Sequence, residues 1–206
     1  MLTRPELKND ALRTLRGKWK LPVLTTLVLS LIGVFTSYSG NIAVSAIYFA
    51  FGSLIALFVS LNLDYGFEVA MLRFNRGREN TLNETFNAGL VEDYGRVLGI
   101  MLLQALYVIL WMLLLIIPGI IKSYAYAMTN FIAEDNPELS PMECIDRSMA
   151  MMKGHKWELF LLDLSYIGWL ILGVLSLGIG LLWIIPWMQM AHVKFYEELK
   201  REKPTV

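Results

Sequence analysis

Residues 97–117 read VLGIMLLQALYVILWMLLLII and contain no charged side chain. A transmembrane α-helix needs about 20 mostly apolar residues to cross the hydrocarbon core of a bilayer. This stretch meets that requirement. Three others also meet it: Leu21–Ser39, Ile42–Leu63 and Gly180–Tyr196. The sequence therefore predicts an all-α, polytopic membrane helical bundle.

The composition supports the same class. Hydrophobic residues make up 56% of the chain and charged residues 17%, whereas soluble domains usually hold about 45–50% and about 25%. The single cysteine, Cys144, excludes an intramolecular disulfide and any paired-cysteine metal site. Phosphate-loop, zinc-protease and hydrolase motifs are missing from the sequence. We therefore expect no enzymatic activity, no catalytic or metal-binding residue, no cofactor and no nucleic-acid partner.

Two further apolar stretches leave the number of crossings open. Trp157–Leu175 contains Asp163, and Gly119–Ala133 is short and contains Lys122. If both cross, every basic residue except Lys122 falls on the side of the N-terminus, whereas five crossings would place the basic C-terminal cluster on the other side. Basic residues concentrate on the cytoplasmic side of membranes. We therefore predict about six spans in a bacterial plasma membrane, with both termini in the cytoplasm. A signal peptide over residues 1–40 is the alternative.

Short turns are expected between paired spans. Gly and Pro mark such turns, which places one turn at Pro118-Gly119 and another at Ser176–Gly180.

Three helix-start signals suggest an internal repeat. Thr3–Glu6, Thr81–Glu84 and Ser140–Glu143 each follow the capping-box pattern, in which a hydroxyl residue and a glutamate three positions later satisfy free N–H groups. A small residue follows each cap after eight positions, and a glycine after fourteen. The small residues are Ala11, Gly89 and Ser148, and the glycines are Gly17, Gly95 and Gly154. We expect a single integral domain, 1–206, of three units, about 3–80, 81–139 and 140–206. Each would hold a cytoplasmic amphipathic helix, a glycine break and a transmembrane hairpin, unless the signals coincide by chance.

Several motifs also resemble a known family. They are LLLIIPG at 113–119, Asp135-Asn136-Pro137, MKGHK at 152–156, Gly178-Ile179-Gly180 with Leu182-Trp183 and Pro186, and Phe195-Tyr196. Together they resemble the bacterial integral-membrane family of unknown function nine-seven-five. The resemblance implies a bacterial membrane protein without an established activity. It also implies a distant similarity to membrane domains of glycerophosphodiester phosphodiesterases, whose catalytic domain this chain lacks.

Asp163 is the main candidate for a functional residue inside the membrane, where a charge is costly. Gln189 and His192 lie in the last predicted span at a similar depth. A carboxylate–imidazole pair there would relay protons or gate a substrate. The alternative is a structural hydrogen bond between helices, or a carboxylate that reaches water.

The charged residues at the end of the second span have a simpler interpretation. Asp64 and Glu68 precede Arg73 and Arg76, which indicates a charged exit from the membrane with local ion pairs. A substrate vestibule is the alternative.

Basic residues near the predicted interfaces are candidates for lipid-headgroup contacts, since each contributes about 1 kcal/mol at an anionic surface. They are Arg13, Arg16, Lys18, Lys20, Lys122, Lys153 and Lys156. His155 and Glu158 share a helix face, which is typical of polar packing more often than of a metal site.

The layout limits the function. The predicted outer turns are short and uncharged, so a soluble partner would bind on the cytoplasmic side. We expect membrane lipids and a cytoplasmic or membrane protein as partners. The favoured hypothesis is a membrane-organising, accessory or scaffold protein; a small transporter or channel and a lipid-modifying membrane enzyme are the alternatives.

Overall fold

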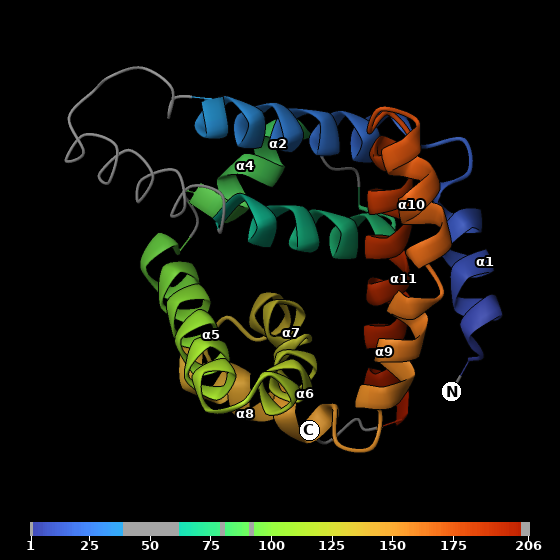
Figure 1. Ribbon diagram of the computed structural model, residues 1–206. Helices are drawn as coiled ribbons and strands as arrows, with labels where there is room; N and C mark the ends of the chain where they lie inside the picture. Colours follow the sequence, from blue (N-terminus) through green and yellow to red (C-terminus); the bar gives the residue numbers. More distant parts are fainter. Residues whose placement is uncertain (1, 39–61, 79–80, 91–92, 203–206) are drawn as a thin grey trace.

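The structure is a computed structural model that describes residues 2–38, 62–78, 81–90 and 93–202. These residues form helices and their connections, with no strand, so the all-α prediction is confirmed for them (Figure 1). The helices are α1 Arg4–Leu15, α2 Lys20–Tyr38, an unlabelled helix over 62–75, α4 Leu82–Leu90, α5 Tyr94–Leu114, α6 Ile116–Tyr126, α7 Thr129–Asp135, α8 Pro141–Met151, α9 Lys156–Leu164, α10 Ile167–Leu175 and α11 Leu181–Glu202. The predicted span Ile42–Leu63 lies almost wholly outside the described residues.

All three predicted capping boxes are present. The backbone N–H of the cap residue donates to the glutamate carboxylate at 2.7 Å for Thr3–Glu6, 2.6 Å for Thr81–Glu84 and 2.8 Å for Ser140–Glu143. These contacts start α1, α4 and α8 at the residues that the sequence predicts.

The small residue eight positions after each cap is a packing site. Ala11, Gly89 and Ser148 are all buried. A Cβ atom at Gly89 would lie 2.1 Å from the backbone oxygen of Asn62, so α4 crosses the helix over 62–75 at close range. The Ser148 hydroxyl donates to the Ala125 carbonyl at 2.9 Å and thereby fixes α8 to α6. By contrast, α1 packs on α11, which joins the two ends of the chain.

The turn expected at Pro118-Gly119 lies three residues earlier. Helix α5 ends at Leu114, Leu115 is extended, and α6 begins at Ile116. Gly119 is needed inside α6, because a Cβ there would lie 2.4 Å from the Met112 side chain on the facing helix. The glycine therefore serves close helix packing rather than the turn.

Several predicted boundaries also differ. The stretch Gly119–Ala133 is divided between α6 and α7, and Trp157–Leu175 is divided between α9 and α10. Gly17 and Gly154 have left-handed φ angles of 78° and 94°, as a break requires. The break predicted at Gly95 instead falls at Asp93, which has a φ of 47°, and Gly95 lies within α5. The turn after α10 lies at Ser176–Gly180, as predicted.

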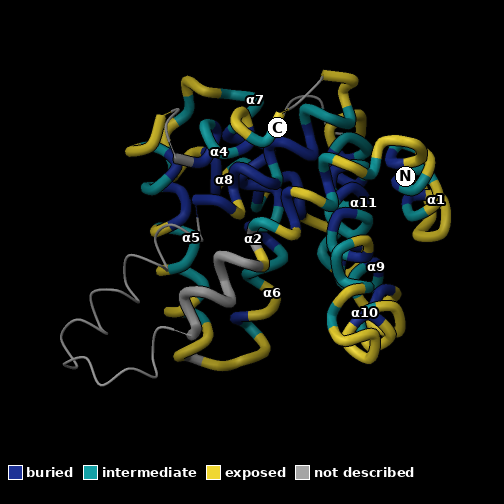
Figure 2. The backbone as a smooth tube through the Cα atoms, turned by 90° about the horizontal axis from the view of Figure 1, so that it is seen from above, coloured by how far each residue is buried: buried dark blue, intermediate teal, exposed yellow. Residues whose placement is uncertain are grey.

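Among the described residues, two segments are long and apolar enough to cross a membrane, Tyr94–Leu113 and Lys156–Leu175. The ends of the two hairpins that contain them are exposed: Leu113 is 78% exposed and Leu177 is 94% exposed. In the view of Figure 2 both ends lie along one edge and α1 and α7 lie toward the opposite edge, whereas in Figure 1 the α10–α11 end is at the top and the α5–α6 end at the bottom. Two such helices are compatible with membrane association, and the remaining predicted crossings stay a prediction.

Candidate functional site

The predicted pair Asp163–His192 is in direct contact. Asp163 of α9 and His192 of α11 approach to 2.5 Å between Oδ1 and Nε2. The other carboxylate oxygen accepts a hydrogen bond of 3.0 Å from the hydroxyl of Tyr124 on α6. Tyr124 was not among the predicted site residues, because nothing in the local pattern of α6 distinguishes it. Asp163 thus connects three helices.

Gln189, the third predicted residue, lies beside a different carboxylate. Glu68, on the helix over 62–75, accepts a hydrogen bond of 2.8 Å from the Asn130 amide of α7, and Gln189 of α11 is next to it. Burial raises the pKa of Glu68; Asn130, the charge of His192 and Gln189 act in the opposite direction. Within the described part of the chain, Asn130 Oδ1 is buried without a hydrogen-bond partner.

These two groups form one polar layer in the bundle interior. Glu68, Asn130 and Gln189 come from the three helices that end the predicted units, and His192 lies one helical turn beyond Gln189 on α11. Its charge acts on Glu68, and its ring contacts Asp163. Carboxylates, amides and an imidazole in this arrangement can exchange protons or bind a small polar group.

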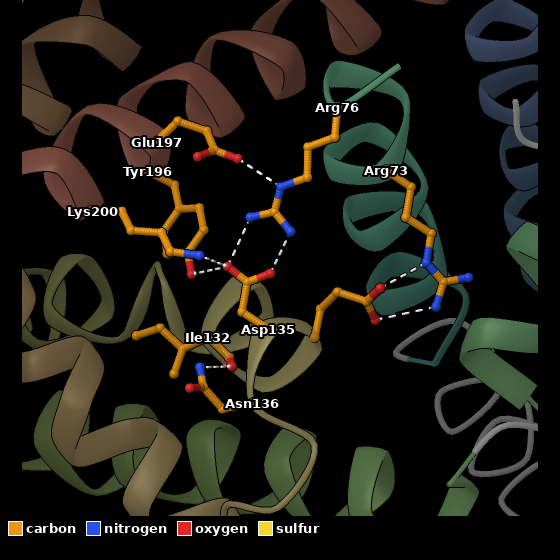
Figure 3. Close-up of polar contacts among 9 residues, drawn as sticks. Arg73, Arg76, Ile132, Asp135, Asn136, Tyr196, Glu197 and Lys200 are labelled. Carbon is orange, nitrogen blue, oxygen red and sulfur yellow. Dashed lines mark hydrogen bonds and ion pairs between the residues drawn. The ribbon is translucent and has the colours of Figure 1, made fainter. Parts of the chain in front are cut away.

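A separate ion cluster joins the ends of the same three helices (Figure 3). Asp135, at the end of α7, accepts hydrogen bonds from the two terminal guanidinium nitrogens of Arg76, from the Lys200 ammonium at 2.7 Å and from the Tyr196 hydroxyl at 2.8 Å. Burial alone would raise the pKa of Asp135, but these donors outweigh it and lower the pKa to about 2. Arg76 also donates to Glu197 at 2.8 Å.

The local ion pairs predicted for Arg73 and Arg76 are wrong. Arg73 pairs with Glu134 at 2.7 Å, and Arg76 pairs with Asp135, although both carboxylates are about sixty residues away in the sequence. The charged segment after the second span is therefore a tertiary connection between helices. The long-range partners could not be read from charge spacing alone.

Arg96 holds the Asp135-Asn136-Pro137 turn. Its guanidinium donates to the backbone oxygens of Asn136 at 2.7 Å, Leu139 at 2.8 Å and Ala133 at 3.2 Å. The last carbonyls of a helix lack intrahelical partners and carry partial negative charge. Arg96 thus caps α7 from the start of α5.

The predicted headgroup residues are mostly at the surface. Arg13, Arg16, Lys18, Lys20 and Lys153 are exposed and Lys156 is half-buried. Lys122 instead lies over the Trp111 ring at 4.8 Å.

His155 contacts Glu158 at 2.9 Å, as their shared helix face predicts, and Glu202 at 3.5 Å. The described residues contain no group of three or more His, Cys, Asp or Glu residues placed to hold a metal ion.

Comparison with known proteins gives one match that covers almost the whole chain. The family model described as "Protein of unknown function (DUF975)" matches residues 1–122 and 100–203. The chain belongs to this family. The family description names no activity, substrate or partner, and the distant similarity to phosphodiesterase membrane domains stays a prediction. No curated protein and no solved structure matches the chain.

Proposed function

We propose that the chain crosses the bacterial plasma membrane six times, with both termini in the cytoplasm, and acts as a membrane-organising or accessory protein. One observation carries this proposal: the ends of the α5–α6 and α10–α11 hairpins are apolar and exposed. Large exposed apolar surfaces are typical of membrane or protein contacts. Helix α5, with 21 residues, is about 31 Å long, close to the thickness of the hydrocarbon core.

The helix breaks support the same location. Backbone groups inside a bilayer must be paired within the protein. Between α6 and α7, the Met128 N–H donates to the Ser148 hydroxyl at 3.2 Å, and the Thr129 hydroxyl donates to the Tyr126 carbonyl at 2.7 Å. Between α9 and α10, the Ser165 hydroxyl donates to the Leu162 carbonyl at 2.6 Å. Hydroxyl groups thus replace part of the missing helical hydrogen bonds at both breaks.

The accessory role is supported by what the interior carboxylates contact. Asp163 connects α6, α9 and α11, and Asp135 connects α7, α11 and the helix over 62–75. Such contacts fix helix pairing, which a scaffold requires and which needs no reaction.

A small transporter is the second candidate. It is favoured by the Glu68 carboxylate, which lies beside Gln189 and the Asn130 amide, whose Oδ1 has no hydrogen-bond partner among the described residues. A buried acceptor next to a carboxylate could bind a small polar solute.

Cysteine labelling with a membrane-impermeant maleimide tests the topology. In a Cys144→Ser background, Leu115→Cys and Leu177→Cys should react in intact cells, whereas Arg78→Cys and Arg201→Cys should react only after permeabilisation. Labelling of Leu177→Cys only after permeabilisation would overturn the six-span proposal. Release of the protein from the membrane by a carbonate wash would overturn it too.

Mass spectrometry of native membrane patches then separates the two roles. The accessory role requires a protein partner at fixed stoichiometry that still copurifies with a Glu68→Gln variant. A chain without a partner that retains a small solute, and loses it in Glu68→Gln, would instead be a transporter.

A further inference from the structure

A groove of about 510 Å³ lies between α1 and the α9–α11 helices. Arg4, Lys8 and Leu12 line it from α1, and Ser165, Trp169 and Trp187 line it from the other side. Its only lining residue from α10 is Trp169, near the start of that helix. The groove therefore combines two basic side chains with two tryptophan side chains.

Lys8 is a cation whose contacts in the described structure are all neutral. Its ammonium donates to the Ser165 carbonyl at 3.0 Å and hydroxyl at 3.3 Å. It also lies 4.1 Å from the Tyr166 ring and 5.2 Å from the Trp187 ring. Burial lowers the pKa of Lys8, and no carboxylate within the described ranges forms an ion pair with it. A partly buried charge of this kind calls for a counter-charge.

Arg96 and Lys122 also have only neutral contacts among the described residues, but three other basic residues pair with carboxylates. Arg76 and Lys200 contact Asp135, and Lys194 contacts Asp10 at 2.9 Å. Arg4, at the same end of the groove as Lys8, likewise forms no ion pair among the residues described. The groove thus holds two basic groups that form no ion pair among the described residues.

The remaining walls suit a hydrocarbon chain. Trp169 and Trp187 pack edge to face, with ring centroids 5.6 Å apart. The indole N–H of Trp187 donates a hydrogen bond of 2.9 Å to the Lys8 carbonyl. The rest of the indole ring is apolar and lines the groove. Tryptophans of this kind are enriched where a membrane protein meets the lipid headgroups.

We propose that this groove binds one anionic phospholipid, with its phosphate against Lys8 and Arg4 and an acyl chain along Trp169 and α10. The charge favours an anionic headgroup over a zwitterionic one, and the apolar walls favour a lipid over free phosphate. This inference rests on the membrane location proposed above.

Native mass spectrometry of the full chain in neutral detergent tests the site. Phosphatidylglycerol or phosphatidylcholine is added, and the fraction with one bound lipid is measured. The wild-type chain should bind phosphatidylglycerol with the higher affinity. Lys8→Gln should weaken that binding about tenfold, as expected for loss of a charge-assisted contact. Arg13→Gln is the matched control, because it removes the same charge from an exposed position of α1 that does not line the groove.

Further variants keep the test informative. Arg4→Gln should also weaken binding, and it breaks no described hydrogen bond, so it covers the case in which Lys8→Gln fails to fold. Inorganic phosphate should not compete. Equal lipid retention in Arg4→Gln, Lys8→Gln and Arg13→Gln, equal binding of both lipids, or competition by phosphate would overturn the lipid site. If only the lipid site is wrong, the cysteine-labelling pattern stays as predicted. If the proposed membrane topology is wrong, the labelling pattern itself differs from the prediction.

Discussion

Replacing Asp135 with asparagine should weaken the connection between α7, α11 and the helix over 62–75. The Asp135 side chain is 8% exposed and contacts Arg76, Lys200 and Tyr196. Asparagine keeps the size of the side chain but removes its charge. Arg76 retains its second partner, Glu197, so the cluster loses one charge rather than all its contacts.

The pKa of Asp135 gives the magnitude. It falls from an ordinary value of 3.8 to about 2, and one pKa unit corresponds to about 1.4 kcal/mol. The carboxylate thus contributes about 2 kcal/mol to the free energy of unfolding. Because the folded-state pKa is lowered, this contribution is fully present above about pH 4 and is lost as the pH falls toward 2.

Thermal unfolding in detergent micelles measures the effect. At pH 7, Asp135→Asn should lower the Tm by about 4–8 °C, given about 2–4 °C per kcal/mol for a chain of this size. The difference from wild type should shrink as the pH falls from 4 to 2. Asp10→Asn is the control, because the carboxylate of its pair with Lys194 is 40% exposed and such pairs contribute under about 1 kcal/mol. Equal losses in the two variants, or a difference that does not depend on pH, would refute the reasoning.

Three further substitutions probe other contacts. Gly89→Ala would place a methyl group against the Asn62 carbonyl and should cost about 3 kcal/mol of unfolding free energy by overpacking; normal accumulation and Tm would contradict this packing. Ser140→Ala removes the cap of α8 and should cost about 1 kcal/mol, measured by denaturant unfolding and absent if the cap does not form. Asp163→Asn weakens the contact with His192 and should cost about 1–2 kcal/mol; in detergent unfolding, an unchanged variant would argue against a structural role for this pair.

Local features of the fold could be predicted from the sequence. The capping boxes depend on residues three positions apart, so Thr3, Thr81 and Ser140 define their helix starts without tertiary information. The turn after α5 could not be placed, because Gly119 resembles a turn signal but is required by contact with Met112. The sequence shows that a residue is small, and only packing shows why.

The polar layer could also be predicted only in part, because residue types can be read from the sequence but contacts between distant helices cannot. Asp163 and His192 stood out because both are polar in apolar segments, and their depth brought them together. For Glu68 the sequence predicts only a charged exit from the membrane, because its partner Asn130 lies about sixty residues later in the chain. Gln189 lies in the last predicted span at the predicted depth, but which carboxylate it faces depends on the rotation of α11 about its axis, which periodicity does not determine.

The packing of α1 on α11 has a consequence for biosynthesis. The buried face of α1, with Leu7, Ala11 and Leu15, finds its partner only when the last helix of the chain has been made. At a translation rate of about 5–20 residues per second, that delay is roughly 10–40 s. During this interval the apolar face of α1 lacks its main partner, α11, and the inner leaflet is the nearest apolar phase. Helix α1 would then be made before the other described helices but would dock after most of them.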